Sequence, residues 1–384
     1  MKLRYTLGTR NIVPPGGFRA IRKSGEVAAS TSHDVLVREL RRDYPDETRQ
    51  QLQQRVDEAT CENLVRRKSF GMLDVHVPSL KEQGNVTFIP NDMLLPAPHN
   101  YNPGLFRWKD ELMMCYRRHL DNAFSEIALA AIATEDLLPR KEMPQFTLDI
   151  PKEFNNEDHE DARIFWHDDD IYVSYTMWRR ATLNGRWLYM PRIDVAVFDA
   201  EWQFKRKFTP LFGRNTEASE KNWTFFSQDG TLYFCYDFHP KHVIGKIIKD
   251  EKCELVSETP GISWDYGIIR GSTPPQRISD TEYLSFFHSR KTDVGPPGKN
   301  RYYAGAYCFE AKEPFRITRY TTESVFAGSE KDTVWDYSLA CVFPCGLVID
   351  GNTALVSMGS NDMECAIARV DVPELLEKMT LHES

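Results

Sequence analysis

Three charged residues stand together at the start of an apolar strand. In the stretch "HEDARIFWHDDDIYVSYT", residues 159–176, Glu160, Asp161 and Arg163 precede a run of aromatic and β-branched residues. Charged groups at such a position are costly unless they pair or take part in chemistry. Burial beside Glu160 would keep Asp161 protonated and able to donate a proton, and Arg163 would oppose this unless it pairs with Glu160. Acids at strand starts are also common turn residues, so the pattern alone leaves both interpretations open.

The composition is that of a globular protein without an obvious charged partner. The chain has 384 residues, of which 41% are hydrophobic and 27% charged, and its formal net charge is -8. This acidic balance argues against nucleic acid or an anionic membrane surface as a partner. No apolar run approaches the ~20 residues that cross a bilayer, and the N-terminus lacks the apolar segment of a signal peptide.

The cysteines and the acidic cluster "HDDD" give no metal signature. The eight cysteines form no CxxC pair and no zinc spacing, which predicts reduced thiols in a cytoplasmic protein. "HDDD", residues 167–170, fills a hairpin turn, and solvated turn acids explain it better than metal ligands do. We therefore expect neither a metal nor a cofactor.

The first 70 residues differ from the rest of the chain. Residues 31–68 are rich in Arg, Gln, Glu and Leu, and their apolar residues recur at helical spacing. The sequence predicts an N-terminal extension with two helices over residues 1–70, followed by a catalytic domain over 71–384. The apolar faces of these helices must be buried, either against the domain or in a homo-oligomer.

A repeat of about 60 residues follows. Each repeat has an apolar strand, a tight turn and a second apolar strand. The five copies begin at Leu105, Arg163, Trp223, Pro275 and Cys345. Such hairpins at this period predict an all-β protein, a five-bladed β-propeller, although a two-sheet sandwich also shows many short strands.

Polar residues recur at the same two places in every repeat, which favours the propeller. One place is the segment before each first strand, and the other is the end of each second strand. The second strands end at Arg117, Thr176, Asp237, His288 and Ser360. Because the inner strands of a propeller run in one direction, these residues should meet around one central pocket.

These motifs resemble a known enzyme family. "EDAR", "EKNW", "GSTPP", "YLSFFHS", "RYYAGAY" and "VFPCGLVIDGNTALVSMGSND" are similar, in order and spacing, to motifs of the β-mannoside phosphorylase family (glycoside hydrolase family 130). That family is a five-bladed β-propeller. The resemblance covers about residues 100–375 and misses the N-terminal helices.

The resemblance implies cleavage of a β-mannoside by inorganic phosphate, with inversion, to give α-mannose 1-phosphate. Some relatives hydrolyse β-mannosides, and some in the wider group transfer mannose from a nucleotide sugar. By resemblance, Asp161 is the proton donor. The implied phosphate-binding residues are Arg192, Lys221, Arg270, His288, Tyr302 and Tyr303. The implied sugar-binding residues are Asn102, Arg117, Glu160, Arg163, Asp237 and Asp362.

Three positions depart from the family pattern. Ala162 replaces the proline of EDPR, and Ser289 replaces the glycine of YHG. The segment "GIIRGSTPP" lacks a phosphate-gripping lysine where the family has "KRIGAGPPP", and Arg270 is the candidate substitute. The phosphate site is therefore incomplete by strict matching.

The sequence thus predicts a mannosyl-transferring enzyme rather than a sugar-binding module, because the donor aspartate and most of the cationic set are retained. The first hypothesis is a phosphorylase that uses a mannoside oligosaccharide and phosphate or a sugar phosphate. One alternative is a mannosyltransferase that uses GDP-mannose. Another is a hydrolase, in which Glu160, Asp237 or Asp362 would hold the attacking water.

Overall fold

The computed structural model divides the chain into two compact units, Met1–His76 with Thr292–Lys299, and Val77–Lys291 with Asn300–Ser384. It describes residues 18–21, 27–30, 37, 40–49, 51–52 and 55. From residue 79 to 382 it describes all but 121–123, 154–156, 184–185, 213–219, 250, 293–299 and 329–337.

The N-terminal unit contains a short hairpin that the sequence analysis did not anticipate. Strands β1 (Phe18–Ile21) and β2 (Val27–Ser30) pair antiparallel. Residues 40–43 are helical, and Leu40 and Leu52 are buried. Most of the two helices predicted over residues 31–68 lies outside the described residues, so they and the homo-oligomer stay predictions.

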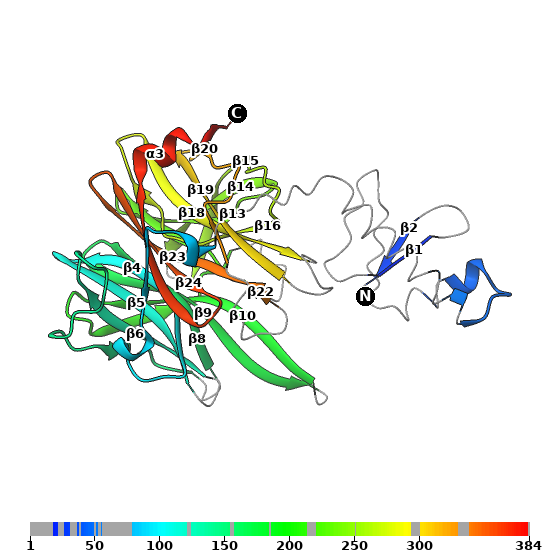
Figure 1. The fold of residues 1–384 in the computed structure, drawn as a ribbon, viewed down its shortest axis with the longest axis horizontal. Coiled ribbons are helices and arrows are strands. Elements are labelled where there is room, and N and C mark those ends of the chain that lie inside the picture. Colours follow the sequence, from blue (N-terminus) through cyan, green and yellow to red (C-terminus); the bar gives the residue numbers. More distant parts are fainter. Residues whose placement is uncertain are drawn as a thin grey trace. The chain divides into compact units, whose positions relative to one another are not determined.

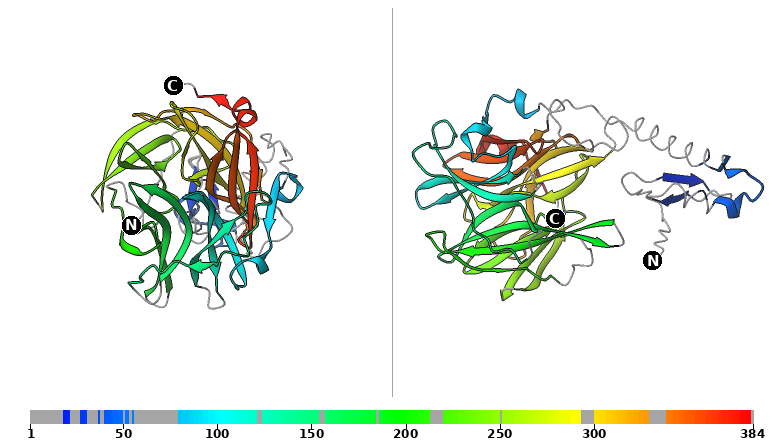
Figure 2. Two further views of the ribbon diagram at one scale, coloured as in Figure 1. Left: turned by 90° about the vertical axis from the view of Figure 1, so that its left-hand side faces the viewer. Right: turned by 90° about the horizontal axis from the view of Figure 1, so that it is seen from below.

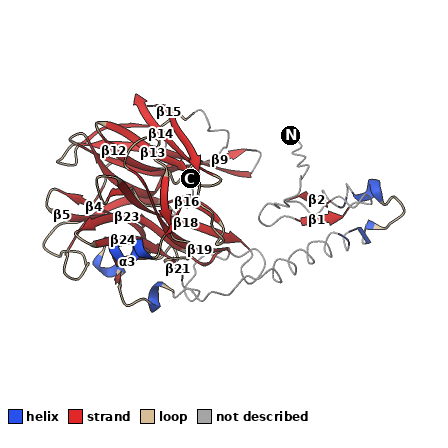
Figure 3. Cartoon of the chain, turned by 90° about the horizontal axis from the view of Figure 1, so that it is seen from above, coloured by secondary structure: helices blue, strands red, loops and turns tan. Residues whose placement is uncertain are grey.

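The second unit consists almost entirely of strands (Figure 3). Four of the sheets in its described part have four strands each. The first contains β4 (His99–Trp108), β5 (Glu111–His119), β6 (Ser125–Ile132) and β7 (Phe146–Thr147). The second contains β8 (Glu157–His167), β9 (Asp170–Leu183), β10 (Arg186–Phe198) and β11 (Phe204–Phe208). The third contains β12 (Thr224–Gln228), β13 (Thr231–Asp237), β14 (Lys241–Lys249) and β15 (Lys252–Pro260).

The last four-stranded sheet joins the two ends of this unit. It contains β23 (Val342–Asp350), β24 (Thr353–Ser360), β25 (Glu364–Asp371) and β3 (Val86–Ile89). Because β3 precedes the other sheets in the chain and pairs with β25, it fastens the end of the unit to its beginning.

The remaining sheet has eight strands. They are β16 (Ile268–Gly271), β17 (Gln276–Arg277), β18 (Glu282–Thr292), β19 (Asn300–Glu310), β20 (Ile317–Tyr320), β21 (Phe326–Ala327), β22 (Ser338–Ala340) and β26 (Thr380–Leu381). The described helical segments of the unit are short: η1 (Leu80–Glu82), η2 (Asn91–Met93) and α3 (Val372–Glu377).

The sheets surround a common centre (Figures 1 and 2). Strand β4 packs beside β8 and β23, β12 packs beside β8, β13 beside β16, and β19 beside β23. The predicted all-β propeller is therefore confirmed. The predicted count of five like blades is not confirmed, because four of the described sheets have the regular four-stranded form and the other is larger and irregular.

Each sheet is buried on both faces, because it packs between two others. Strand β5 shows this alternation. Met113 and Cys115 join the apolar cluster shared with the β8 sheet, whereas Leu112, Met114 and Tyr116 join the cluster shared with the β23 sheet. The period of two along a strand thus explains why these strands are apolar throughout.

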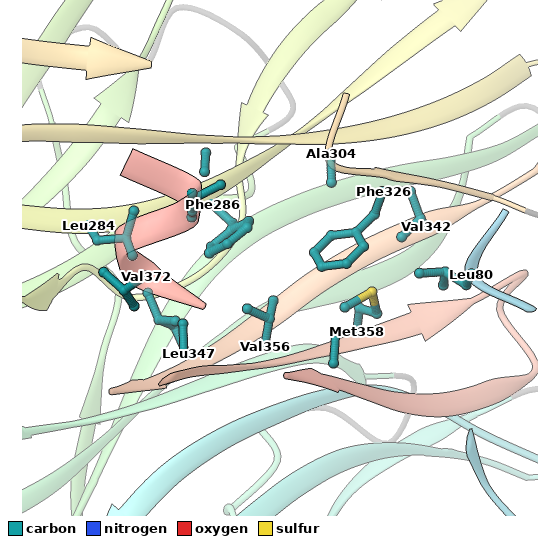
Figure 4. Close-up of a cluster of buried hydrophobic side chains, with 14 of the residues drawn as sticks. Leu80, Leu284, Phe286, Ala304, Phe326, Val342, Leu347, Val356, Met358 and Val372 are labelled. Carbon is teal, nitrogen blue, oxygen red and sulfur yellow. The ribbon is translucent and has the colours of Figure 1, made fainter. Parts of the chain in front are cut away.

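Figure 4 shows one such cluster, between the eight-stranded sheet and the β23 sheet. Phe286 of β18 and Phe326 of β21 face Val356 and Met358 of β24. Val372 of α3 also belongs to this cluster, so the helix covers its open end. Burial of this kind contributes about 25 cal/mol for each Å² of apolar surface.

Four of the five predicted hairpins have two-residue turns, whereas residues 278–281 join β17 to β18. Lys109, Asp168 and Asp229 occupy the left-handed region, with φ of 55°, 50° and 50°, and Gly351 has φ of 57°. Two-residue turns of this conformation match the twist of antiparallel strands. Asp168 and Asp169 of "HDDD" accordingly lie in a turn, and Asp170 begins β9.

Strands β4 and β23 approach too closely for a side chain at Gly346. A Cβ atom there would lie 1.9 Å from the backbone nitrogen of Leu105 in the neighbouring sheet. We expect Gly346→Ala to lower the free energy of unfolding by about 3 kcal/mol or more, because two sheets must separate. Urea denaturation measures this. Gly84→Ala is the control, since nothing lies within 4 Å of a Cβ at Gly84, and a similar small loss in both variants would contradict the prediction.

Candidate active site

Backbone bulges direct the polar side chains at the strand mouths toward the centre. The pairing of β8 with β9 shifts register between Glu160 and Arg163, and that of β4 with β5 shifts between Tyr101 and Gly104. Within these bulges Asp161 has φ of 54° and Asn102 has φ of 50°. Left-handed non-glycine residues cost on the order of 1–3 kcal/mol each and are concentrated at functional sites. The strain indicates that these side chains are placed for a purpose.

The same backbone feature occurs in two other sheets. Asn222, before β12, has φ of 67°. Asn361 and Asp362, which follow β24, have φ of 54° and 56°. The mouths of four sheets therefore carry left-handed Asn or Asp residues.

Three carboxyl groups meet around one arginine. Asn102 donates from Nδ2 to Asp161 Oδ1 at 2.7 Å. Arg117 donates from Nη2 to Glu160 Oε1 at 2.5 Å, and its Nη1 lies 3.7 Å from Asp161 Oδ1. Asp362 lies close enough for its pKa, which burial raises, to be pulled back by the charge of Arg117. The structure thus brings together predicted sugar-binding residues and the predicted proton donor.

This carboxyl cluster retains a proton near neutral pH. Burial raises the pKa of Glu160 to about 8, although Arg117 opposes the shift and the charge of Asp161 adds to it. Burial raises the pKa of Asp362 to about 6, again against Arg117 and with Asp161 adding to the shift. Lys221 lowers both pKa values, so it faces the same space. With Arg117 and Lys221 as the cations, three like charges cannot all be ionised cheaply.

A second group of residues surrounds His288. This histidine is buried, and its Nδ1 lies 2.8 Å from Ser272 Oγ. Its ring stacks on Tyr302, with centroids 6.2 Å apart, and lies 4.5 Å from the ring of Phe343. Burial holds the pKa of His288 well below its ordinary value, and nearby cations lower it further. Those cations are Arg163, Arg270, Lys221 and Arg290. A neutral imidazole among cations is suited to an anion.

Two of the candidate phosphate-binding residues, Arg270 and Lys221, are cations with described neighbours. Arg270 is exposed and lies opposite His288 in the pairing of β16 with β18. Lys221 Nζ lies 4.9 Å from the centre of the Trp178 ring. This cation–π contact holds the ammonium group at one place.

Arg163 lies in an enclosed position. It is only 1% exposed and does not pair with Glu160, which binds Arg117 instead. Its guanidinium donates to Ser272 O at 2.5 Å, to Asp161 O at 2.9 Å and to Asn222 Oδ1 at 3.3 Å. A side chain enclosed in this way offers a sugar almost no surface, which argues against its assignment as sugar-binding.

Two more predicted residues make contacts that lead away from the cluster. Arg192 donates to Asp194 at 2.9 Å and lies 3.6 Å from Glu153. Asp237 accepts N–H groups of the two residues that follow it, as turn aspartates do. The binding roles of Arg192 and Asp237 therefore stay predictions, because a strand position does not reveal which neighbour a side chain meets.

Tyr303 is likewise turned toward other aromatic residues. Its ring lies 5.0 Å from Tyr266 and 5.6 Å from the guanidinium of Arg301. The adjacent Tyr302, by contrast, stacks on His288. Successive residues of a strand point to opposite faces, so only one of the pair can line the site.

Sequence reasoning did not select Asn222, Ser272, Phe343 and Trp178, although each contacts a predicted residue. An Asn directly before an apolar strand, in "EKNW", was the one available signal, because Asn tolerates the left-handed conformation. Ser272 and Trp178 acquire their roles through strands distant in the chain.

Other kinds of site receive no support within the described residues. No group of His, Cys, Asp and Glu side chains there is arranged to hold a metal ion. The described cysteines are unpaired. No helix in the described part is long and apolar enough to cross a membrane.

Ionisation of Asp362 should make folding depend on pH. Its pKa of about 6 in the folded protein exceeds the ordinary value, so the folded state binds the extra proton between about pH 4 and 6. This group's contribution to stability falls as pH rises through that window and stays low above it. Asp362→Asn should therefore gain stability relative to wild type from pH 4 to 6, by about 1–2 kcal/mol. Urea denaturation at several pH values measures the difference, and a flat difference, as expected for the exposed control Asp280→Asn, would contradict it.

The comparisons with known proteins identify the family and the fold. A family model described as beta-1,4-mannooligosaccharide phosphorylase matches residues 83–381. A comparison with curated proteins finds no match.

Solved structures share the fold at low identity. A β-1,2-mannobiose phosphorylase from Listeria innocua is 15% identical, with a TM-score of 0.54, over 77% of this chain and 93% of that one. A mannose phosphorylase from Leishmania mexicana, in complex with phosphate, is 12% identical, with a TM-score of 0.54, over 84% and 97%. A GDP-Man-dependent mannosyltransferase from Leishmania mexicana is 15% identical, with a TM-score of 0.50, over 81% and 95%. Because the family model spans most of the chain, this protein belongs to glycoside hydrolase family 130.

Proposed function

We propose that this protein is a mannoside phosphorylase, which transfers a mannosyl group from a β-mannoside to inorganic phosphate. The observation that carries the proposal is that the carboxyl cluster at Asp161 and the cationic surroundings of His288 are joined through hydrogen bonds. Asn102 and Arg117 contact the carboxyl of Asp161, and Arg163 links the backbone of Asp161 to Ser272, whose hydroxyl contacts the buried His288. A phosphorylase needs one proton donor and one anion site, because phosphate arrives already ionised.

Asp161 is the proposed proton donor. Its carboxyl gives the proton to the glycosidic oxygen, and the bond between that oxygen and C1 of mannose breaks with the electron pair going to the oxygen. A phosphate oxygen forms the new bond to C1 from the opposite face, which inverts the configuration. Asp161 ends as a carboxylate, which Asn102 and Arg117 stabilise through their contacts with Oδ1.

The anion side is proposed to hold phosphate through Lys221, Arg270, His288 and Tyr302. If His288 Nδ1 accepts a hydrogen bond from the Ser272 hydroxyl, the neutral ring carries its N–H at Nε2, which can donate a hydrogen bond to a phosphate oxygen. Lys221 and Arg270 supply the charge that the missing family lysine would supply. We further infer that the eight-stranded sheet, which contributes His288, serves as the remaining blade.

Hydrolysis is the second candidate, and one observation favours it. Glu160 and Asp362 both lie near Asp161, and either could hold the water that an inverting hydrolase activates. Glu160 is the weaker choice, because its Oε1 already accepts from Arg117 and its raised pKa favours the protonated form, which cannot act as a base.

Replacement of the proton donor tests the assignment. Asp161→Asn should lower kcat at least ~100-fold, since it removes general acid catalysis. The measurement is release of mannose 1-phosphate from β-1,4- and β-1,2-mannobiose with phosphate, with free mannose counted as hydrolysis and GDP release from GDP-mannose assayed in parallel. Asp168→Asn, at an exposed turn of the same sheet, is the control and should keep its activity. Retained turnover in Asp161→Asn would sink the assignment.

Phosphate dependence separates the two candidates. Lys221→Met should raise the KM for phosphate by at least ~10-fold, because it removes a charge-assisted hydrogen bond. Lys205→Met, which removes a lysine paired with Asp170 on an outer strand, should leave that KM unchanged. Wild-type turnover that does not depend on phosphate would favour hydrolysis instead.

A further inference from the structure

Arg163 is a buried charge whose hydrogen bonds go to three separate segments. Within the described residues its guanidinium donates to two carbonyl oxygens, of Asp161 and Ser272, and to the side-chain oxygen of Asn222. It is 1% exposed, and it lies 5.5 Å from the centre of the Phe343 ring. A guanidinium stays charged at any physiological pH, so its burial must be compensated by well-placed acceptors.

Each acceptor lies next to a residue of the proposed reaction. The carbonyl of Asp161 belongs to the proton donor itself, and the bond fixes a peptide that Asp161 holds in the left-handed conformation. Asn222, also left-handed, directly follows Lys221. The bonds of Arg163 therefore reach both the acid and a cation of the anion side.

The third acceptor leads to the histidine. Ser272 accepts from Arg163 through its carbonyl and contacts His288 Nδ1 through its hydroxyl, at 2.8 Å. Phe343 also links Arg163 to His288, because its ring contacts both the guanidinium and the imidazole. Rigid groups linked by short hydrogen bonds keep their mutual distances.

We propose that Arg163 is a positioning residue that holds the proton donor Asp161 at a set distance from the anion-binding residues Lys221 and His288. This role rests on the proposed function, and it differs from sugar binding because Arg163 has no exposed surface to offer. In phosphorolysis the acid acts on one side of C1 while phosphate attacks the other. A fixed distance between the two groups therefore sets how often both are aligned.

The test replaces Arg163 while a matched arginine serves as control. Lysine keeps the charge at Arg163→Lys, but its donors all sit on one ammonium nitrogen and cannot reproduce the planar spread of the three guanidinium nitrogens that bond here. We expect kcat per folded molecule to fall ~100-fold, with the KM for the mannoside changed less than about threefold. Arg206→Lys is the control, because Arg206 also lies over a ring, that of Phe208, and contacts Tyr172, but on the outermost strand of the same sheet. It should keep wild-type kcat.

A rescue measurement distinguishes positioning from a general structural effect. Guanidinium chloride at about 20 mM, far below unfolding concentrations, should restore at least ~10-fold of the kcat lost in Arg163→Ala and leave Arg206→Ala unaffected. If neither Arg163 variant folds, Ser272→Ala is the alternative test. It keeps the Ser272 carbonyl that accepts from Arg163 and removes only the hydroxyl that contacts His288. We expect it to raise the KM for phosphate at least ~5-fold.

The outcomes are distinct. A rise in mannoside KM with unchanged kcat in Arg163→Lys would overturn the inference in favour of direct sugar binding. Unchanged kcat per folded molecule, or no rescue, would overturn it in favour of a structural role alone. If wild type hydrolyses mannosides without phosphate, the proposed function fails, and a crystal structure of Arg163→Lys then decides. Asp161 leaving its left-handed conformation supports positioning, and Asp161 unmoved overturns it.

Discussion

The buried guanidinium of Arg163 is the interaction on which the site depends. It belongs to β8 and bonds to two other segments. One is Asn222, just before β12, and the other is Ser272, between β16 and β17. Apolar packing between sheets has little directional preference and tolerates small sliding movements. Hydrogen bonds from a planar, charged donor do not, because their strength falls steeply with angle. Arg163 thus gives the centre an orientation that the surrounding apolar clusters could not impose.

The chemistry of the centre follows from crowding like charges in a space with little water. Glu160, Asp161 and Asp362 come from the mouths of two sheets that are far apart in the chain. Their mutual repulsion and burial, opposed by Arg117 and Lys221, raise the pKa of two of them. The propeller makes this possible, since the starts of its inner strands converge. The left-handed bulges then turn the side chains inward at a cost that the rest of the fold offsets.

Much of this organisation was predictable from local patterns. Hairpin turns such as Asp229–Gly230 have a strong local preference, and the alternation of buried residues in strands such as β5 follows from the pleat. The repeat also indicated that polar residues at the ends of the inner strands lie near one another. Those residues include Asn102, Arg117, Asp161 and Lys221. Whether Arg163 pairs with Glu160 was left open by the sequence. The alternatives, Glu160 three positions earlier or a carbonyl 109 positions away, cannot be ranked without the distance between sheets.

The sequence by itself therefore determined the all-β repeat, the tight turns, and the place in each repeat where polar residues occur, because these depend on neighbours within a few positions. Only the tertiary structure decided which polar residues meet. Tyr302 stacks on His288, whereas Tyr303 contacts Tyr266. Arg192 pairs with Asp194, Asp237 bonds to its own turn, and Glu160 accepts from Arg117. The tertiary structure also brought Trp178 over Lys221 and Ser272 to His288. The physical reason is that these contacts run between sheets, where position is set by packing and by a few directional bonds rather than by the order of residues in the chain.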